Sequence, residues 1–124
     1  MPFKSRLDAD RRIAFVEFSG KATYSEIEQY TRQLRGDPNF QPDFAQFINA
    51  SGVTDTDLNT SELERLATAD PFAKDAVRVI IAGSDFVFSV ARMFESISDL
   101  PRLSVVRTRD EAFRILGLSS DAAD

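Results

Sequence analysis

The segment from Ala76 to Ile97 constrains the fold more than any other part of this chain. Apart from Arg78, residues 76–82 are small or β-branched, and after Arg78 they are apolar on both alternating faces. Two apolar faces are typical of a central strand in a parallel sheet that helices cover on each side. Gly83 permits a turn and Ser84 can cap a helix, so the segment predicts a central strand, a tight turn and a helix over residues 85–97.

The predicted helix has one broad apolar arc and one polar arc. The apolar arc comprises Phe86, Val87, Val90, Ala91, Met93, Phe94 and Ile97. Phe88 falls outside it, between Arg92 and Glu95 on the polar side. Two interpretations of Phe88 remain open: a loop over residues 53–59 covers it, or it is an aromatic anchor for a partner or ligand. Arg92 would then either flank that anchor or pair with Glu95.

The rest of the chain predicts strands that alternate with helices after an opening hairpin. Strands are expected over residues 3–8, 12–19, 44–50 and 103–107, and helices after the capping-box patterns Thr23–Glu26, Ser61–Glu64 and Thr108–Glu111. This order predicts an α/β domain with a mostly parallel mixed sheet of about five strands, an antiparallel N-terminal edge strand and about four helices. The single domain is expected to cover residues 1–118, with a frayed tail over residues 119–124.

Composition limits the chemistry that the chain can perform. Its net charge is −5 and it has no run of Lys or Arg, which argues against nucleic acid as a partner. It contains no Cys and no His, which removes thiol nucleophiles, zinc–thiolate sites and the commonest general base. No cofactor or metal is therefore expected. The sequence shows neither a signal peptide nor a membrane span, so a cytoplasmic location is expected.

Several short runs follow one another in the order and spacing of a known family. They are Phe18-Ser19-Gly20 before Thr23-Tyr24-Ser25-Glu26, Asp37-Pro38-Asn39-Phe40, Phe47-Ile48-Asn49-Ala50-Ser51, Val77-Arg78-Val79-Ile80-Ile81, Ala91-Arg92-Met93-Phe94-Glu95 and Glu111-Ala112-Phe113. Together they resemble the SpoIIAA-like family of the STAS superfamily, whose wider fold group includes CRAL-TRIO lipid-binding domains. The resemblance implies a SpoIIAA-like (STAS) fold and a regulatory, protein-binding role.

The resemblance also draws attention to Ser51. Anti-sigma antagonists of this kind are switched by phosphorylation of a serine at the start of the helix after the third strand. Asn49-Ala50-Ser51-Gly52 is similar to their Asp-Ser-Ser-Gly run, which makes Ser51 the matching position. Here an Asn replaces the acidic residue, and an expected loop over residues 53–59 separates Ser51 from its helix. The alternative is that Ser51-Gly52 only forms a turn.

The candidate binding residues are thus Asn49, Ser51, Ser84, Phe88 and Arg92. Ser84 either binds a ligand at the carboxyl end of its strand, where open α/β sheets place binding crevices, or only caps a helix. The leading hypothesis is a non-enzymatic STAS-like interaction module that binds a protein partner or a second copy of itself. A small apolar ligand or lipid, as in CRAL-TRIO domains, is the alternative, and a hydrolase built on one of the two serines comes third.

Overall fold

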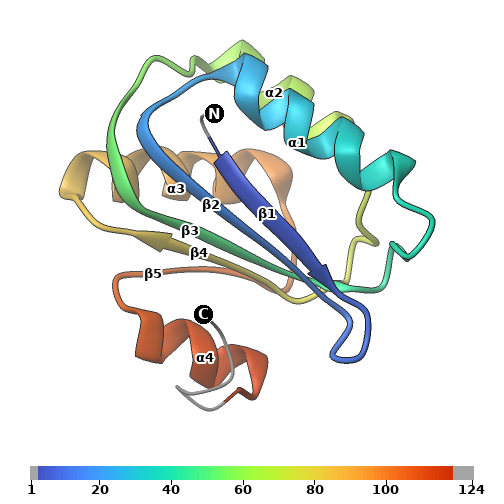
Figure 1. Ribbon diagram of the computed structural model, residues 1–124. Helices are drawn as coiled ribbons and strands as arrows, with labels where there is room; N and C mark the ends of the chain where they lie inside the picture. The colour runs from blue at the N-terminus through green and yellow to red at the C-terminus, as the bar shows by residue number, and fades with distance from the viewer. Residues whose placement is uncertain (1–2, 119–124) are drawn as a thin grey trace.

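The computed structural model describes residues 3–118, which form one mixed sheet with helices on both faces (Figure 1). The elements are β1 (Phe3–Asp8), β2 (Ile13–Ala22), α1 (Tyr24–Gly36), β3 (Ala45–Thr56), α2 (Thr60–Thr68), β4 (Arg78–Ala82), α3 (Asp85–Ser98), β5 (Leu103–Val106) and α4 (Arg109–Leu116). The strand order is β1-β2-β3-β4-β5, with β1 antiparallel to β2 and the other pairs parallel. The predicted mixed sheet is confirmed; the predicted tail over residues 119–124 lies outside the described residues.

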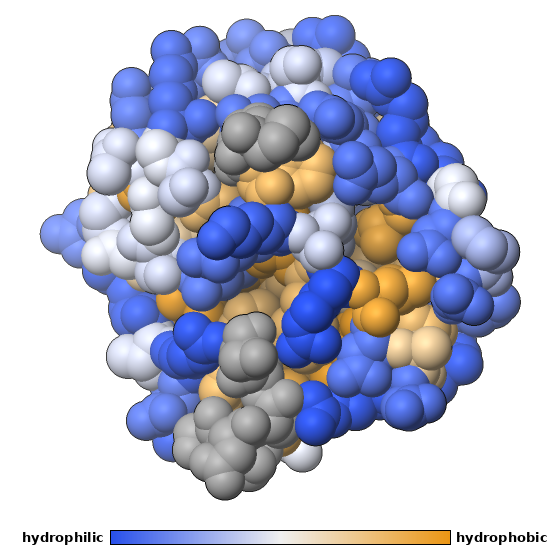
Figure 2. Space-filling view, in the orientation of Figure 1, coloured by the Kyte–Doolittle hydropathy of each residue, from blue (hydrophilic) through white to orange (hydrophobic). Residues whose placement is uncertain are grey.

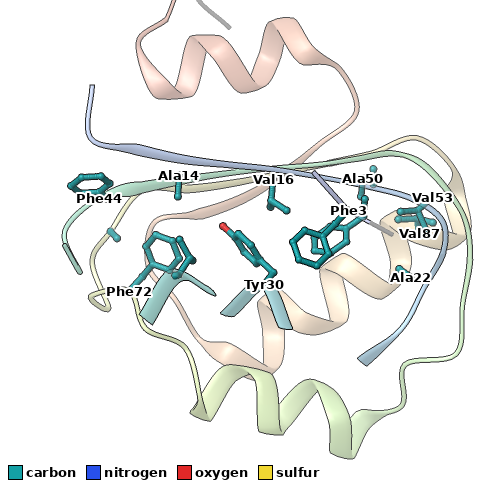
Figure 3. Packing of buried hydrophobic residues seen from close by; sticks show 14 residues of the cluster. Phe3, Ala14, Val16, Ala22, Tyr30, Phe44, Ala50, Val53, Phe72 and Val87 are labelled. Atoms are coloured by element: carbon teal, nitrogen blue, oxygen red, sulfur yellow. The ribbon is translucent and has the colours of Figure 1, made fainter. Parts of the chain in front are cut away.

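The sheet separates two layers of buried side chains. Helices α1, α2 and α3 cover one face, and α4 covers the other (Figure 1). Strand β2 shows the division clearly, because Ala14, Val16 and Phe18 belong to the larger cluster and Ile13 and Phe15 to the one beneath α4. Figure 3 shows the larger cluster on the side of the sheet opposite α4. Strict alternation along one strand therefore supplies both cores.

Strand β4 is the interior strand that the sequence predicts, although it is not the central one. All five of its residues are buried, and it pairs in parallel with both β3 and β5. The centre belongs to β3, because the N-terminal hairpin adds two strands beyond β3 whereas only β5 lies beyond β4. The strand also begins at Arg78 rather than at Ala76.

The predicted loop over residues 53–59 is wrong for most of its length. Strand β3 continues to Thr56, because its second half pairs with the end of β2, where Gly20 lies opposite Val53 and Ala22 opposite Thr56. The Thr56 hydroxyl donates to the Ala22 carbonyl oxygen at 2.8 Å. Helix α2 then starts with an Asn59–Glu62 capping box instead of the predicted Ser61–Glu64 box. The Asn59 side chain accepts from the Glu62 N–H at 2.8 Å, and Asn caps a helix as well as Ser does.

Helix α3 begins as predicted but is less buried than its apolar arc suggests. The Val87 N–H donates to the Ser84 hydroxyl at 3.2 Å, which confirms Ser84 as the helix cap. Val87 and Ala91 are buried against the sheet, whereas Phe86 is 51% and Met93 45% exposed. The arc is therefore wider than the surface that the sheet and α2 can cover.

Candidate functional site

An apolar pocket of about 150 Å³ lies between the sheet and helices α1, α2 and α3. Its apolar wall is formed by Ile27 of α1, Leu63 and Leu66 of α2, Val87, Val90 and Phe94 of α3, and Phe18, Ile48, Val53 and Ile80 of the sheet. Small residues at Ala22, Ala50 and Ala91 also line it and leave the space that larger side chains would fill. An apolar cavity of about 150 Å³ in another protein is large enough to bind benzene.

Besides Thr31 and Thr56, four polar residues line the same pocket, and we call these four the polar cluster: Tyr30, Gln46, Asp70 and Arg78. The Arg78 Nη1 lies 2.5 Å from the Asp70 carboxylate, and its Nη2 donates to the Ala73 carbonyl oxygen at 2.9 Å. The Gln46 amide donates to the Tyr30 hydroxyl at 3.2 Å. Only 3% of the Arg78 side chain and 16% of the Asp70 side chain are exposed, so the ion pair is largely shielded from water.

Burial controls the protonation of the polar cluster. Desolvation raises the pKa of the Asp70 carboxyl above its usual value, although the neighbouring Arg78 guanidinium pulls that pKa down. Desolvation also raises the pKa of the Tyr30 hydroxyl, so this group stays neutral at physiological pH. The pocket therefore contains one buried cation and one carboxyl group whose charge is costly.

Two buried side-chain atoms within residues 3–118 have no hydrogen-bond partner, Arg78 Nε and Glu26 Oε1. Glu26 belongs to the predicted Thr23–Glu26 capping box, of which the Thr23 half is formed, because the Glu26 N–H donates to the Thr23 hydroxyl at 3.3 Å. Arg78 also lines the apolar pocket, although its Nε atom has almost no accessible surface of its own. Buried donors without acceptors are rare and call for an explanation.

The polar cluster was missed by sequence reasoning, although Arg78 left a signal. It is the first residue of a strand that is otherwise apolar on both faces, and a strand covered on both sides has no solvent face for a charge. Asp70, in contrast, looks like an ordinary helix terminator before Pro71. Tyr30 and Gln46 give no signal that they share a cavity with Arg78.

Two of the sequence-predicted site residues, Asn49 and Ser51, interact with each other on β3. The Asn49 amide oxygen accepts the Ser51 N–H at 3.0 Å and the Ser51 hydroxyl at 2.6 Å. Ser84 lies at the same sheet edge, one residue after Gly83. A Cβ built on Gly83 would lie 2.6 Å from the Ser51 carbonyl oxygen, so the backbones of β3 and the β4–α3 turn are in direct contact.

Phe88 is half-buried and is covered by an arginine rather than by the predicted loop. It packs against the larger apolar cluster, and the Arg107 guanidinium carbon lies 4.3 Å from its ring centroid. Arg107 in turn pairs with Asp85 at 2.8 Å. The Arg92 guanidinium is more distant, at 5.9 Å, and pairs with Glu95 at 2.8 Å. A binding role for Asn49, Ser51, Ser84, Phe88 and Arg92 stays a prediction.

A second hollow, which we call the polar groove, lies on the α4 face of the sheet. It measures about 330 Å³, and Lys4, Arg6, Glu17, Asn49 and Arg109 line it around Phe15 and Phe47. The Arg6 guanidinium covers Phe15, with its carbon 4.1 Å from the ring centroid. Figure 2 shows the β1 side of the molecule, where hydrophilic residues surround exposed apolar surface. The polar groove exists because α4 has only eight residues and leaves the β1–β2 half of this face uncovered.

Residues 3–118 contain no group of three or more acidic, His or Cys side chains arranged to hold a metal ion. Within the same range, no helix combines the length and the apolarity that crossing a bilayer requires.

Comparison with known proteins identifies the fold. No protein-family model matches the sequence, and no curated protein does. Among solved structures, the chain is similar to an uncharacterised protein of the DUF3478 family with a SpoIIAA-like fold from Shewanella loihica PV-4. The TM-score is 0.62 at 15% identity, and the match covers 92% of this chain and 93% of that one. The chain therefore has a SpoIIAA-like fold, as its resemblance to that family implies.

Proposed function

We propose that this chain is a non-enzymatic binding module that holds a small, mainly apolar molecule between its sheet and helices α1–α3. The observation that carries the proposal is the apolar pocket itself. Protein interiors are normally packed as densely as organic crystals, and apolar pockets with a few polar groups are the usual small-molecule sites. The second of the three sequence-based hypotheses is therefore the one that the geometry favours.

The pocket volume sets the size of the ligand and the strength of binding. A volume of about 150 Å³ accommodates one aromatic ring or a short branched chain. A molecule that loses roughly 200 Å² of apolar surface gains about 5 kcal/mol at about 25 cal/mol per Å². Before the entropy cost of association is subtracted, this gain corresponds to a dissociation constant of roughly 0.2 mM, so that value is an upper limit on the affinity. Tighter binding requires a polar contact as well.

Ethylbenzene is a suitable probe, because it is apolar and has the required size. We expect it to bind the wild-type chain, as followed by chemical-shift changes of the amides that surround the pocket. Val90→Phe places extra volume in the pocket from a partly exposed helix position, and should weaken binding about tenfold or more. The matched control is Met93→Phe, on the same helix but outside the pocket lining.

Two results would contradict the proposal. One is the absence of any saturable ethylbenzene binding to the wild-type chain. The other is equal binding by Val90→Phe and wild type, because the ligand would then sit elsewhere. Met93→Phe should match the wild type, and urea unfolding of both variants would show that each is folded.

The interaction module is the second candidate, because α3 exposes two large apolar side chains. Phe86 and Met93 are seven residues apart and therefore lie on the same helix face. We propose this pair as the contact for a protein partner or for a second copy of the chain, with Ser51 phosphorylation as its regulation. If the chain sediments as a dimer, Phe86→Ser should shift it to a monomer. A wild-type monomer at high concentration would remove the self-association form of this candidate.

A further inference from the structure

The polar groove concentrates positive charge in a chain whose net charge is −5. Lys4 and Arg6 of β1 and Arg109 of α4 line it, and among the described residues that line it Glu17 is the only acid. Its volume of about 330 Å³ lies within the range of small-molecule sites. Because a recess lined mainly by one sign of charge attracts ions of the other sign, the groove favours an anion.

The strand register places these cations on two sides of the groove. Arg6 pairs in register with Phe15, and Phe15 with Phe47, so these three residues form one row across β1, β2 and β3. Neighbouring strands are about 4.8 Å apart, which puts β1 roughly 10 Å from β3. Beside β3, the Phe113 ring lies 5.6 Å from the Phe47 ring, and the Arg109 guanidinium carbon lies 5.4 Å from the Phe113 ring centroid. The groove therefore has cations of β1 at one side, a cation of α4 at the other, and an aromatic floor between them.

Two of these cations have no acidic partner in the part of the chain that the structure describes. Lys4 lies directly opposite Glu17 in the register, yet no ion pair joins them within residues 3–118. Arg109 is the first residue of α4, where the helix dipole favours acidic side chains and disfavours basic ones. Local stability therefore does not explain why Arg109 is basic, and both side chains are able to bind an anion from solution.

The separation of the cations decides which class of anion fits. A molecule with one acidic group contacts the cations of one side only, whereas acidic groups at both ends of a short body reach both sides. Carboxylates accept charge-assisted hydrogen bonds from Lys and Arg. A flat body suits the floor, because the planar Arg6 guanidinium already lies over Phe15, with its carbon 4.1 Å from the ring centroid.

We propose that the polar groove binds a small, flat organic dianion with an acidic group at each end, one beside Lys4 and Arg6 and the other beside Arg109. The chemical class is that of aromatic dicarboxylates. This site lies on the opposite face of the sheet from the apolar pocket and shares no lining residue with it except Phe18-independent strands β2 and β3, so it does not depend on the proposed function.

Four probes on the wild-type chain test the proposal at pH 7 and low ionic strength. Terephthalate carries a carboxylate at each end of its ring, and terephthalamide has the same shape without charge. Benzoate has one carboxylate, and phenyl phosphate carries its whole charge at one end. We expect terephthalate to bind about fivefold tighter than benzoate, since it gains one more partly exposed ion pair. About 0.5 M NaCl should weaken its binding severalfold. Chemical-shift changes of the amides around the groove measure the binding.

A charge-neutralising substitution tests the α4 side of the groove. Arg109→Gln keeps a long polar side chain and should remove the advantage of terephthalate over benzoate. Arg114→Gln is the matched control, because it removes the same charge from the same helix outside the groove lining. It should bind terephthalate as the wild type does. Urea unfolding should show both variants folded, since both side chains are exposed.

Each contrary outcome overturns the inference. No saturable binding of terephthalate, or binding no tighter than that of benzoate, would show that the two sides do not act together. Tighter binding of phenyl phosphate than of terephthalate would show a one-sided anion site. Equal weakening by Arg109→Gln and Arg114→Gln would show an effect of net charge alone. Ethylbenzene binding to Arg109→Gln should equal that of the wild type, so failure of this inference is distinguishable from failure of the proposed function.

Discussion

The two faces of the sheet are built in opposite ways. Three helices cover one face and yet leave an apolar pocket beneath them, whereas the other face has only α4 and a tightly stacked aromatic core. In that core, Phe47 lies 5.4 Å from Phe15 and 5.6 Å from Phe113, measured between ring centroids. The α4 face is therefore densely packed where Phe113 contacts Phe47, although the polar groove lies on the same face. The hollow beneath α1–α3 is lined mainly by apolar side chains, whereas charged and polar side chains line the one on the α4 face.

The largest effect on stability is expected from the aromatic core beneath α4. Phe113→Ala should lower the free energy of unfolding by about 3–5 kcal/mol, because it leaves a cavity between α4 and Phe47. Urea unfolding followed by circular dichroism measures this change. Ethylbenzene binding to the folded fraction should remain at the wild-type level, and a simultaneous loss of binding would show that the two faces are not independent.

A slightly smaller effect is expected from the buried ion pair on the pocket face. Asp70→Leu alone removes both the hydrogen-bond acceptor and the counter-ion of the buried Arg78 cation, and should destabilise the chain by about 3 kcal/mol at pH 7. The control is Arg78→Met with Asp70→Leu, which should be closer to the wild type than Asp70→Leu alone. If the double variant were the less stable of the two, the pair itself would be a major source of stability.

Substitutions at Ser84 and Ser51 compare the stability contributions of two serines at the same edge of the sheet. Ser84→Ala removes the α3 cap and should cost about 1 kcal/mol in urea unfolding. Ser51→Ala removes only a local bond to Asn49 on an exposed residue, so its cost should stay within about 0.5 kcal/mol. Equal costs would contradict the assignment of Ser84 as the helix cap and of Ser51 as a strand residue that bonds only to Asn49.

The smallest effects concern the pH dependence of stability, where two carboxyl groups act in opposite directions. The pKa of Asp70 is raised by burial, so the native state binds this proton more tightly, and stability falls as pH rises from 3.8 through the raised pKa. Hydrogen bonds from the Arg107 backbone and from Thr108 lower the pKa of Glu111. The stability that ionised Glu111 contributes is therefore lost as pH falls below 4.5.

Unfolding free energy measured against pH separates these two groups. Asp70→Asn should make the slope of unfolding free energy against pH more positive just above pH 3.8, because the negative contribution of Asp70 to that slope is removed. Glu111→Gln should make the slope less positive below pH 4.5, because a positive contribution is removed. Shifts of both slopes in the same direction would contradict the contrast between the two faces.

Most of the fold could be predicted because its signals are local. Alternation along β2, the cap residues Thr108 and Ser84 and the apolar run of β4 each report on a few neighbouring residues. The extension of β3 to Thr56 could not be predicted, since the polar sequence Thr54-Asp55-Thr56 becomes a strand only by pairing with the end of β2. Tertiary pairing outweighs local propensity there.

The candidate site was less predictable, because it depends on distances between elements. A pocket arises from how far α2 and α3 stand from the sheet, and no sequence periodicity encodes that separation. The cover over Phe88 comes from Arg107, nineteen residues further along the chain. Only the buried Arg78, a charge within a doubly apolar strand, could have been recognised in advance.

Gly83 has a mechanical consequence for the pocket. The α-carbon of Gly83 faces the Ser51 carbonyl group, and there is no room between them for even a methyl group. The glycine therefore lets the start of α3 lie as close as possible to β3. A larger residue there would act as a wedge and push the first turn of α3 outward. Val87 and Val90 of that helix line the pocket, so the absence of a side chain at Gly83 helps to set the width of the pocket.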